Sequence, residues 1–584
     1  MCGIACVAGG KGSAIECYKA LSKLEYRGYD SAGMAYLTKD EICLKKQTGM
    51  VAGIEKFAKN CKAGLVISHT RWATHGKPTE ENAHPHLSDS KELAIVHNGI
   101  IENFMQIRAN LEKEGIKFKS QTDSECIANL IASKKGKIVE KVRASIKQLV
   151  GSYAIAILDK KSKRIVATRK ISPLFISKTK KGVMVASDII CFNGIASCYY
   201  SLKEGEIAVV SSRGFKLFDE KGKQIKPCYS KLTQTEEEVS KQGYQYFMEK
   251  EICEIPAVIK RIQMQYKTKE ILKSALKLID GVKNVVLVGC GTAYHASMYG
   301  ASVLQKVLGV PCEAKIASEL KYSNIIIDNT LAIFVSQSGE TADTLGCATL
   351  FKERQAKTLA ITNVMHSGLA KMCDAVLPVF AGAEIAVAST KAYVAQILVL
   401  YLLARCLENS DYDFKDLENL ADDAKNLINI DDEILELVKN ATRVFFVGRG
   451  LDSITALESA LKLKEISYKS AEGYPAGELK HGTIALIDEG SPVFVIATNK
   501  DMLDKTLNSG QEVKARGAKV IVVTFKSASV SGFDYKIDLP DAYSSELLSI
   551  ISVIPFQLLA FKASVLLGNN PDKPRNLAKS VTVE

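Results

Sequence analysis

The chain has 584 residues, of which 47% are hydrophobic and 24% are charged. This composition excludes a disordered or fibrous protein, and at roughly 150 residues per domain the length predicts about four structural domains. The 77 basic and 65 acidic residues give a formal charge of +12 without any dense basic run, so we expect no nucleic-acid partner.

The first 230 residues are predicted to form short β-strands interrupted by a few helices. Glycine, asparagine and aspartate separate the β-rich runs, a pattern typical of strands joined by turns. Helices are predicted at 15–24, at 102–114 and after Asp123. We therefore expect an α+β layered domain over residues 2–230.

A polar segment with three adjacent glutamates follows this domain. Polar runs of this kind between patterned regions are typical of linkers. We predict that residues 231–243 connect two structurally different parts of the chain.

Beyond the linker, long helical patterns alternate with short, wholly apolar runs, which are typical of parallel strands buried on both faces. Three apolar runs recur in the same order about 159 residues later, which indicates two copies of one doubly wound α/β domain. The matching pairs are 285–291 with 444–450, 331–341 with 491–501, and 357–363 with 518–525. The expected boundaries are 244–425, 426–575 and a C-terminal tail at 576–584.

The fifteen cysteines form no CxxC pair, so a zinc ribbon or a thioredoxin-type motif is not expected. Their odd number, with no secretory signal at the start, favours reduced thiols in the cytoplasm. The most apolar run, 547–561, is short and contains Pro555, so no membrane span is expected.

Cys2 directly follows the initiator methionine. Removal of Met1, expected before a small residue, would give Cys2 both a thiol and a free α-amino group. The reference pKa of an α-amino group is about 8, which suits a general base beside its own nucleophile. A cysteine at this position is more often inert, so its interpretation depends on the motifs around it.

Three polar motifs follow apolar runs in the first domain: HTRWATHG at 69–76, HNGIIEN at 97–103 and QTDSE at 121–125. The fixed positive charge of Arg71 suits a carboxylate. The amide of Asn98 and the backbone N–H of Gly99 can form an oxyanion hole, and Asp123 suits an ammonium group. These three recognition elements together describe glutamine.

These motifs, with CGIA at Cys2 and EYRGYDSAG at Glu25, resemble the class II glutamine amidotransferase domain, an N-terminal-nucleophile hydrolase. The resemblance implies that Cys2 is the nucleophile and that Asn98 and Gly99 form the oxyanion hole. It also implies a gate for ammonia at Trp72 and glutamine binding by Arg71, Thr74, His75 and Asp123. A zinc site at His84, His86 and His97 is the weaker alternative, and we expect no metal.

Two turns of the first α/β copy carry possible anion-binding groups. Gly289–Thr292 ends an apolar strand and opens a helix, where backbone N–H groups favour an anion. SQSGET at 336–341 adds three hydroxyls, which suit a phosphate, although a serine-rich helix cap explains them about equally well. The matching turn at 497–500 lacks this set, so we expect only the first copy to bind phosphate. The glycine pattern is too incomplete to favour a dehydrogenase.

Glu458, Lys462 and Glu465 lie at i, i+4 and i+7 of a predicted helix. A solvated stripe of ion pairs is the ordinary explanation and is favoured by this pattern alone. The functional alternative is a general base beside a cation. The sequence ELKHG adds His481 in a loop.

These motifs resemble paired sugar-isomerase domains. Together with the ending PRNLAKSVTVE, the whole chain is similar to a family that makes glucosamine 6-phosphate and glutamate from fructose 6-phosphate and glutamine without a cofactor. The resemblance implies a phosphate cradle and sugar contacts at Ser336, Gln337, Ser338, Thr341, Thr292, Val387 and Ala578.

The same resemblance assigns the isomerisation chemistry. It implies that Lys579 forms a Schiff base with the sugar and that Glu465 moves a proton, with Lys462 beside it. It also implies that the ring-opening histidine, His481, comes from a neighbouring subunit, so a homodimer is expected. Ala293 departs from the family, where a serine is expected. The remaining alternatives are a class II amidotransferase acting on another sugar phosphate and a non-enzymatic sugar-phosphate sensor.

Overall fold

The computed structural model describes residues 2–232, 240–324 and 327–582. The chain forms two compact units: a first unit of residues 1–240 with 578–584, and a second unit of residues 241–577. Most of the predicted linker, 233–239, lies outside the described residues.

The first unit contains two antiparallel sheets. One has the strand order β15-β11-β9-β10-β1-β4-β2-β3, and the other has the order β14-β13-β12-β8-β7-β6-β5. Their strands are β1 (Gly3–Gly9), β2 (Ser31–Leu37), β3 (Ile42–Thr48), β4 (Leu65–Arg71), β5 (His86–Leu87), β6 (Leu93–Ile101), β7 (Gly151–Asp159), β8 (Arg164–Lys170), β9 (Phe175–Thr179), β10 (Gly182–Ala186), β11 (Cys198–Ser201), β12 (Ile207–Ser211), β13 (Gly214–Phe218), β14 (Gln224–Ile225) and β15 (Ser230–Lys231).

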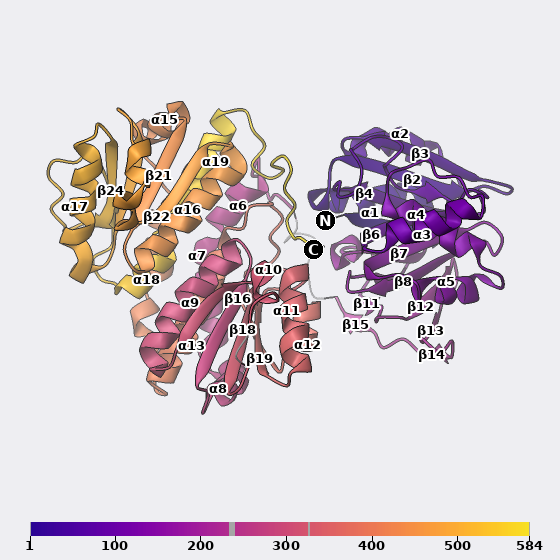
Figure 1. Ribbon diagram of the computed structural model, residues 1–584, viewed down its shortest axis with the longest axis horizontal. Helices are drawn as coiled ribbons and strands as arrows, with labels where there is room; N and C mark the ends of the chain where they lie inside the picture. Colours follow the sequence, from indigo (N-terminus) through magenta and orange to yellow (C-terminus); the bar gives the residue numbers. More distant parts are fainter. Residues whose placement is uncertain (1, 233–239, 325–326, 583–584) are drawn as a thin grey trace. The chain divides into compact units, whose positions relative to one another are not determined.

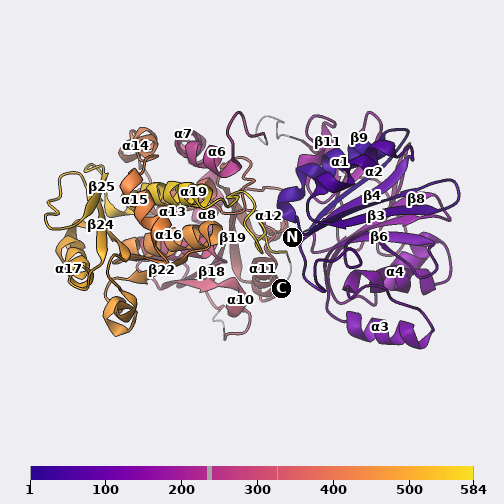
Figure 2. The same cartoon turned by 90° about the horizontal axis from the view of Figure 1, so that it is seen from above.

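Helices cover the outer faces of both sheets, giving four layers (Figure 2). Alternation along β6 explains this layering, because successive side chains of a strand point to opposite faces. Ala94 and Val96 pack in the core between the sheets, whereas Leu93 and Ile95 pack beneath the helices. The helices are α1 (Ser13–Lys23) and α2 (Glu55–Asn60) on one side, and α3 (Phe104–Lys113), α4 (Asp123–Ser133) and α5 (Ile138–Ile146) on the other. The predicted α+β layers are confirmed.

The second unit contains two parallel five-stranded sheets, of orders β17-β16-β18-β19-β20 and β22-β21-β23-β24-β25. The two orders correspond strand for strand, which confirms the predicted repeat. The first sheet comprises β16 (Asn284–Gly289), β17 (Cys312–Ile316), β18 (Thr330–Ser336), β19 (Lys357–Thr362) and β20 (Ala375–Pro378). The second comprises β21 (Arg443–Gly448), β22 (Ser470–Pro475), β23 (Pro492–Ala497), β24 (Lys519–Phe525) and β25 (Tyr535–Leu539).

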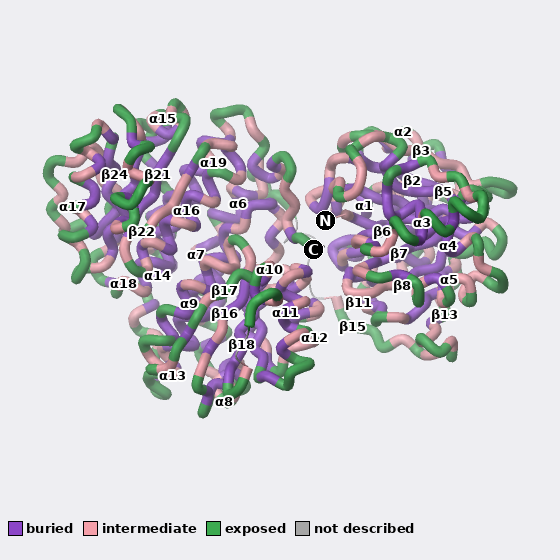
Figure 3. The backbone as a smooth tube through the Cα atoms, viewed as in Figure 1, coloured by how far each residue is buried: buried purple, intermediate pink, exposed green. Residues whose placement is uncertain are grey.

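Helices flank both faces of these sheets (Figure 1), and the strands between them are largely buried (Figure 3). This burial explains why the strands are continuously apolar rather than alternating. The helices are α6 (Phe247–Cys253), α7 (Ile255–Tyr266), α8 (Lys273–Ile279), α9 (Thr292–Leu308), α10 (Ala317–Leu320), α11 (Ala342–Glu353), α12 (Gly368–Met372), α13 (Lys391–Glu408), α14 (Leu420–Asn426), α15 (Asp432–Asn440), α16 (Leu451–Ser467), α17 (Leu503–Lys514), α18 (Ser545–Ile551) and α19 (Ile554–Leu566).

One helical segment of the described chain, Ser545–Leu566, is long and apolar enough to cross a membrane. Its most apolar window is 89% buried inside the protein. A buried segment of this kind is a core element, since its apolar side chains already have protein partners.

Candidate active sites

Cys2 lies immediately before β1, where its thiol contacts the backbone of Trp72. The Trp72 N–H donates to Cys2 Sγ at 3.4 Å, and the thiol donates to Trp72 O at 3.5 Å. Burial raises the pKa of the Cys2 thiol. A thiol with a raised pKa needs a base to become a nucleophilic thiolate.

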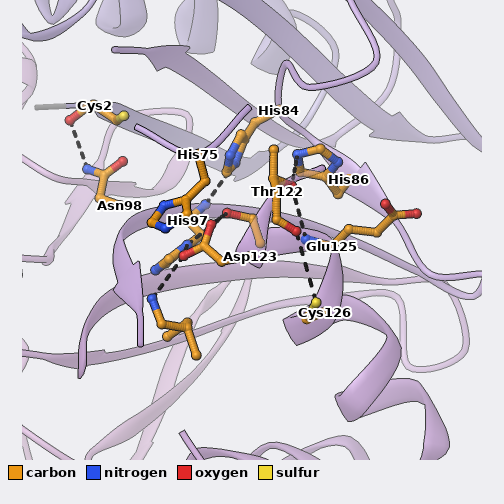
Figure 4. Close-up of polar contacts among 12 residues, drawn as sticks. Cys2, His75, His84, His86, His97, Asn98, Thr122, Asp123, Glu125 and Cys126 are labelled. Carbon is orange, nitrogen blue, oxygen red and sulfur yellow. Dashed lines mark hydrogen bonds and ion pairs between the residues drawn. The ribbon is translucent and has the colours of Figure 1, made fainter. Parts of the chain in front are cut away.

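Asn98, on β6, is held by two hydrogen bonds, of which Figure 4 shows the one to Cys2. Its Nδ2 donates to Cys2 O at 2.9 Å, and its Oδ1 lies 3.0 Å from His69 Nε2. His69 Nε2 also lies 3.0 Å from the carbonyl oxygen of His97. Because both neighbours of Nε2 are acceptors, this nitrogen carries the proton of the neutral ring. Burial lowers the pKa of His69 to about 3, so the ring remains neutral and holds the Asn98 amide group toward Cys2.

Arg71, at the end of β4, is 3% exposed. Its guanidinium donates to His75 O at 2.5 Å, Gly76 O at 3.2 Å and Lys77 O at 3.5 Å. These bonds fix the loop that follows β4. Glutamine binding by Arg71 remains a prediction.

Asp123 is the first residue of α4 and is 3% exposed. Its Oδ2 accepts from the Ile101 N–H at 2.9 Å, and its Oδ1 accepts from Ser124 Oγ at 3.2 Å. Ser124 Oγ also lies 2.9 Å from His97 Nδ1. Figure 4 shows Asp123 beside His97. The carboxylate is therefore rigidly oriented, as a binding group for an ammonium needs to be.

The three histidines of the alternative zinc site are buried in the first unit. Burial lowers the pKa values of His84, His86 and His97, and His84 stacks on His69 with ring centroids 4.1 Å apart. Among the described residues, no group of three or more His, Cys, Asp or Glu side chains has a geometry that fits a metal ion.

In the second unit, the SQSGET turn links the end of β18 to the start of α11. Ser336 Oγ lies 3.1 Å from Thr341 Oγ1 and accepts from the Gly339 N–H at 3.0 Å. Ser338 Oγ accepts from the Glu340 N–H at 3.2 Å. The turn thus gathers hydroxyls before a helix N-terminus, a chemistry suited to phosphate.

The helix stripe of Glu458 and Lys462 is fully buried, with 0% exposure of both residues. The solvated interpretation of this stripe is therefore wrong, because α16 packs this face against α9. Lys462 Nζ lies 2.6 Å from Glu465 Oε2 and 3.4 Å from Glu458 Oε1, and donates to Thr292 Oγ1 at 2.9 Å. The two carboxylates raise the pKa of Lys462 despite the opposing effect of burial. Lys462 is therefore a permanent cation that holds Glu465.

In the matching turn of the second copy, a carboxylate of the same polypeptide accepts the hydrogen bonds that Thr498 could give to an anion. The Thr498 N–H donates to Asp452 Oδ2 at 2.9 Å, and its hydroxyl donates to Oδ1 at 2.5 Å. Asp452 is buried, which raises its pKa to about 6. The residue types in the sequence distinguished the two turns, but this internal acceptor was not predicted.

Five further predicted residues lie in a short helix, in loops or near the C-terminal end of the described chain. His481, in the short helix η7 (Glu478–His481), is exposed, and Thr74 is exposed in the loop after β4. Val387 is buried, and its N–H donates to Asp572 O at 3.3 Å. Ala578 and Lys579 are half-buried and belong to the first unit.

Sequence reasoning missed three orienting groups: His69 and Ser124 in the first unit, and His295 in the second. His69 and Ser124 lie inside the HTRWATHG and QTDSE motifs, so the sequence pointed to their surroundings but did not indicate what these two residues do. His295 Nδ1 lies 2.7 Å from Glu458 Oε2, a pairing across two helices that no local pattern reveals.

Comparison with known proteins identifies the families to which the two units are similar. Residues 278–405 and 437–567 match the SIS domain family, and residues 69–212 match the Glutamine amidotransferase domain family. Over their full lengths, the chain is 41% identical to a glutamine–fructose-6-phosphate aminotransferase (isomerizing) from Clostridium tetani across 609 residues, and 39% identical to one from Francisella tularensis across 614 residues.

Solved structures resemble the second unit. The C-terminal domain of glucosamine-fructose-6-phosphate aminotransferase from Francisella tularensis is 35% identical with a TM-score of 0.53, covering 57% of this chain and 99% of that one. Tagatose-6-phosphate ketose/aldose isomerase from Escherichia coli shares the fold at 20% identity and a TM-score of 0.50, covering 56% of this chain and 96% of that one. The chain belongs to the glutamine–fructose-6-phosphate aminotransferase (isomerizing) family.

Proposed function

We propose that the protein transfers the amide nitrogen of glutamine to fructose 6-phosphate and isomerises the product, giving glucosamine 6-phosphate and glutamate. This reaction is the first step of hexosamine synthesis. The observation that carries the proposal is the full-length similarity to enzymes of that name. The oriented Cys2–Asn98 pair and the buried Glu458–Lys462–Glu465 cluster supply groups for its two half-reactions.

In the glutaminase half-reaction, the α-amino group of Cys2, freed by removal of Met1, takes the thiol proton. The thiolate attacks the amide carbon of glutamine, and Asn98 and Gly99 stabilise the oxyanion. The C–N bond then breaks and ammonia leaves with the proton, after which water hydrolyses the thioester to glutamate. In the substrate complex, Arg71, Thr74, His75 and Asp123 bind glutamine, and Trp72 gates the passage of ammonia.

In the isomerase half-reaction, the hydroxyl turn binds the phosphate. The unprotonated amine of Lys579 condenses with the sugar ketone to form an imine, and the ketone oxygen leaves as water. The ammonia released from glutamine then replaces the lysine nitrogen on the sugar, which frees Lys579. Glu465 moves a proton between C1 and C2, and the cationic Lys462 holds its carboxylate in place. His481 of the partner subunit opens the sugar ring, and the exposure of this residue in a single chain supports that role. The proposed form is accordingly a homodimer.

The cytoplasm is the proposed compartment. All fifteen cysteines are free thiols, as expected where the environment is reducing. The apolar Ser545–Leu566 segment is buried within the protein, which is consistent with a protein that works without a membrane.

The test of this function measures glutamate and glucosamine 6-phosphate from glutamine with fructose 6-phosphate. Tagatose 6-phosphate and ribose 5-phosphate replace fructose 6-phosphate in parallel reactions. We expect amino-sugar formation with fructose 6-phosphate and not with the other two sugar phosphates. Preference for another sugar phosphate supports a different amidotransferase, and sugar binding without turnover supports a sensor.

Borohydride trapping tests the role of Lys579. With fructose 6-phosphate, we expect covalent labelling of Lys579 and none in Lys579→Arg, because arginine does not form the imine. Glutamine hydrolysis should persist in this variant. Peptide mapping that finds the label on another lysine removes Lys579 from the mechanism.

A further inference from the structure

Glu458 is a buried carboxylate with three polar neighbours from two helices. Its Oε2 lies 2.7 Å from His295 Nδ1, and its Oε1 accepts from Thr292 Oγ1 at 3.1 Å. Lys462 Nζ lies 3.4 Å from the same Oε1. His295 and Thr292 come from the first two turns of α9, whereas Glu458 and Lys462 come from α16.

These contacts form a chain that leads to the proposed proton-transfer group. His295 donates to Glu458, Glu458 pairs with Lys462, and Lys462 pairs with Glu465 at 2.6 Å. Thr292 Oγ1 accepts from Lys462 and donates to Glu458, so it provides a second link between these two side chains. The side chain of Glu465 keeps 21% exposure, whereas those of Glu458 and Lys462 have none.

The internal repeat shows that the fold itself does not require these charges. Helices α9 and α16 are matching elements of 17 residues each. At the positions of Glu458 and Lys462, α9 carries Tyr299 and Val303, and both are buried in the apolar core. At the positions of Thr292 and His295, α16 carries Leu451 and Ile454, which also pack against this core.

A buried ion pair is often no more stabilising than apolar residues of similar volume. The protein nevertheless has a buried charged cluster where its own second copy packs apolar side chains. A role in the reaction explains this difference better than a role in packing does.

We propose that His295 is a positioning residue of the isomerase half-reaction. Its imidazole orients Glu458, which fixes the Lys462 ammonium and through it the Glu465 carboxylate that moves the proton. This inference rests on the proposed function, because it assigns His295 to the same isomerase site.

The test compares His295→Leu with His295→Asn in the full-length protein, using the interconversion of fructose 6-phosphate and glucose 6-phosphate. Leucine removes the N–H donor, whereas the side-chain amide of asparagine still offers one to Glu458. For His295→Leu we expect kcat to fall roughly 10- to 100-fold, since a hydrogen bond to a buried charged group is lost. KM should change little, because the phosphate turn is untouched, and His295→Asn should recover most of kcat.

Ser302→Leu is the matched control, because Ser302 is exposed on the same helix. It should retain wild-type kcat. His295→Met repeats the test with a more flexible apolar side chain if His295→Leu does not fold. Glutamine hydrolysis without sugar should be unchanged in every variant.

Two results overturn the inference. Wild-type kcat in His295→Leu or His295→Met shows that Glu465 does not depend on the imidazole, and equal losses in the leucine and asparagine variants show a purely structural role. Failure of the wild-type protein to interconvert the two sugar phosphates instead refutes the proposed isomerase function, so the two failures are distinguishable.

Discussion

Replacing Lys462 by methionine removes one buried cation while keeping most of the side-chain volume. In the folded protein this ammonium lies within 3.4 Å of Glu458 and within 2.6 Å of Glu465. The two carboxylates differ in what they lose. Glu465 is partly exposed and can turn to water, whereas Glu458 is fully buried and, within the described part of the chain, retains Thr292 and His295 as donors.

Removing one partner of a buried ion pair costs about 3–5 kcal/mol. The lower end applies here, because Glu458 keeps two donors and Glu465 regains water. We therefore expect Lys462→Met to lower the free energy of unfolding of the second unit by about 3 kcal/mol. With a urea m-value of at least about 3 kcal/mol per M for a unit of this size, the midpoint shifts by up to about 1 M.

The loss of unfolding free energy caused by Lys462→Met should not vary between about pH 6 and pH 9. The two carboxylates raise the folded pKa of Lys462 above its ordinary value, which is about 10.4 in the unfolded chain. The stabilising charge is present in full below the unfolded pKa and is lost only as the pH rises through the folded pKa. In this pH window the ammonium is therefore charged in both states.

Urea unfolding followed by far-UV circular dichroism measures this loss, and the fluorescence of Trp72, the only tryptophan, reports on the first unit alone. Lys464→Met is the matched control, because Lys464 is exposed on the same helix, and it should change the stability by less than about 0.5 kcal/mol. Equal midpoints for the two variants would refute the argument that Lys462 neutralises a buried carboxylate.

Three further predictions follow from the other clusters. Cys2→Ser should abolish glutamine hydrolysis and leave the interconversion of fructose 6-phosphate and glucose 6-phosphate intact, and wild-type hydrolysis would reject Cys2 as the nucleophile. Ser338→Ala with Thr341→Ala should weaken fructose 6-phosphate binding at least tenfold in calorimetric titration, since two donors to a charged group are lost; unchanged affinity would exclude this turn. The pKa of Asp452, raised to about 6, makes the folded protein bind more protons than the unfolded chain between about pH 4 and pH 6, so this carboxyl lowers stability as pH rises there. Asp452→Asn should flatten that part of a plot of urea midpoint against pH, and an unaltered slope would contradict the assignment.

Much of the fold was predictable because its patterns are local. The apolar runs at 285–291 and 444–450 became equivalent strands, β16 and β21, since strands buried on both faces leave a recognisable signal. Helix α4 begins at Asp123 as predicted, where the Thr122 hydroxyl caps it by accepting from the Glu125 N–H. Helices α2 and α5 were not predicted, because they are short.

The candidate sites were less predictable where partners are distant in sequence. The i, i+4, i+7 spacing located Glu458, Lys462 and Glu465 correctly on one helix but favoured exposure, because spacing does not reveal what packs against a helix face. The 2.7 Å contact of His295 with Glu458 joins residues 163 positions apart. Similarly, the tautomer of His69 depends on acceptors supplied by another strand.

The bond between Asp452 and Thr498 implies that the two copies of the repeat differ in their capacity to bind an anion at this turn. Asp452 stands where the first copy has Ala293. Its carboxylate accepts both hydrogen bonds from Thr498, whereas the methyl group of Ala293 offers no acceptor. We therefore expect the second copy to keep the fold without binding an anion at this turn, because the carboxylate in that place belongs to the polypeptide and cannot dissociate from it. Shortening that side chain would be a direct way to ask whether the second copy still has a latent affinity for small anions.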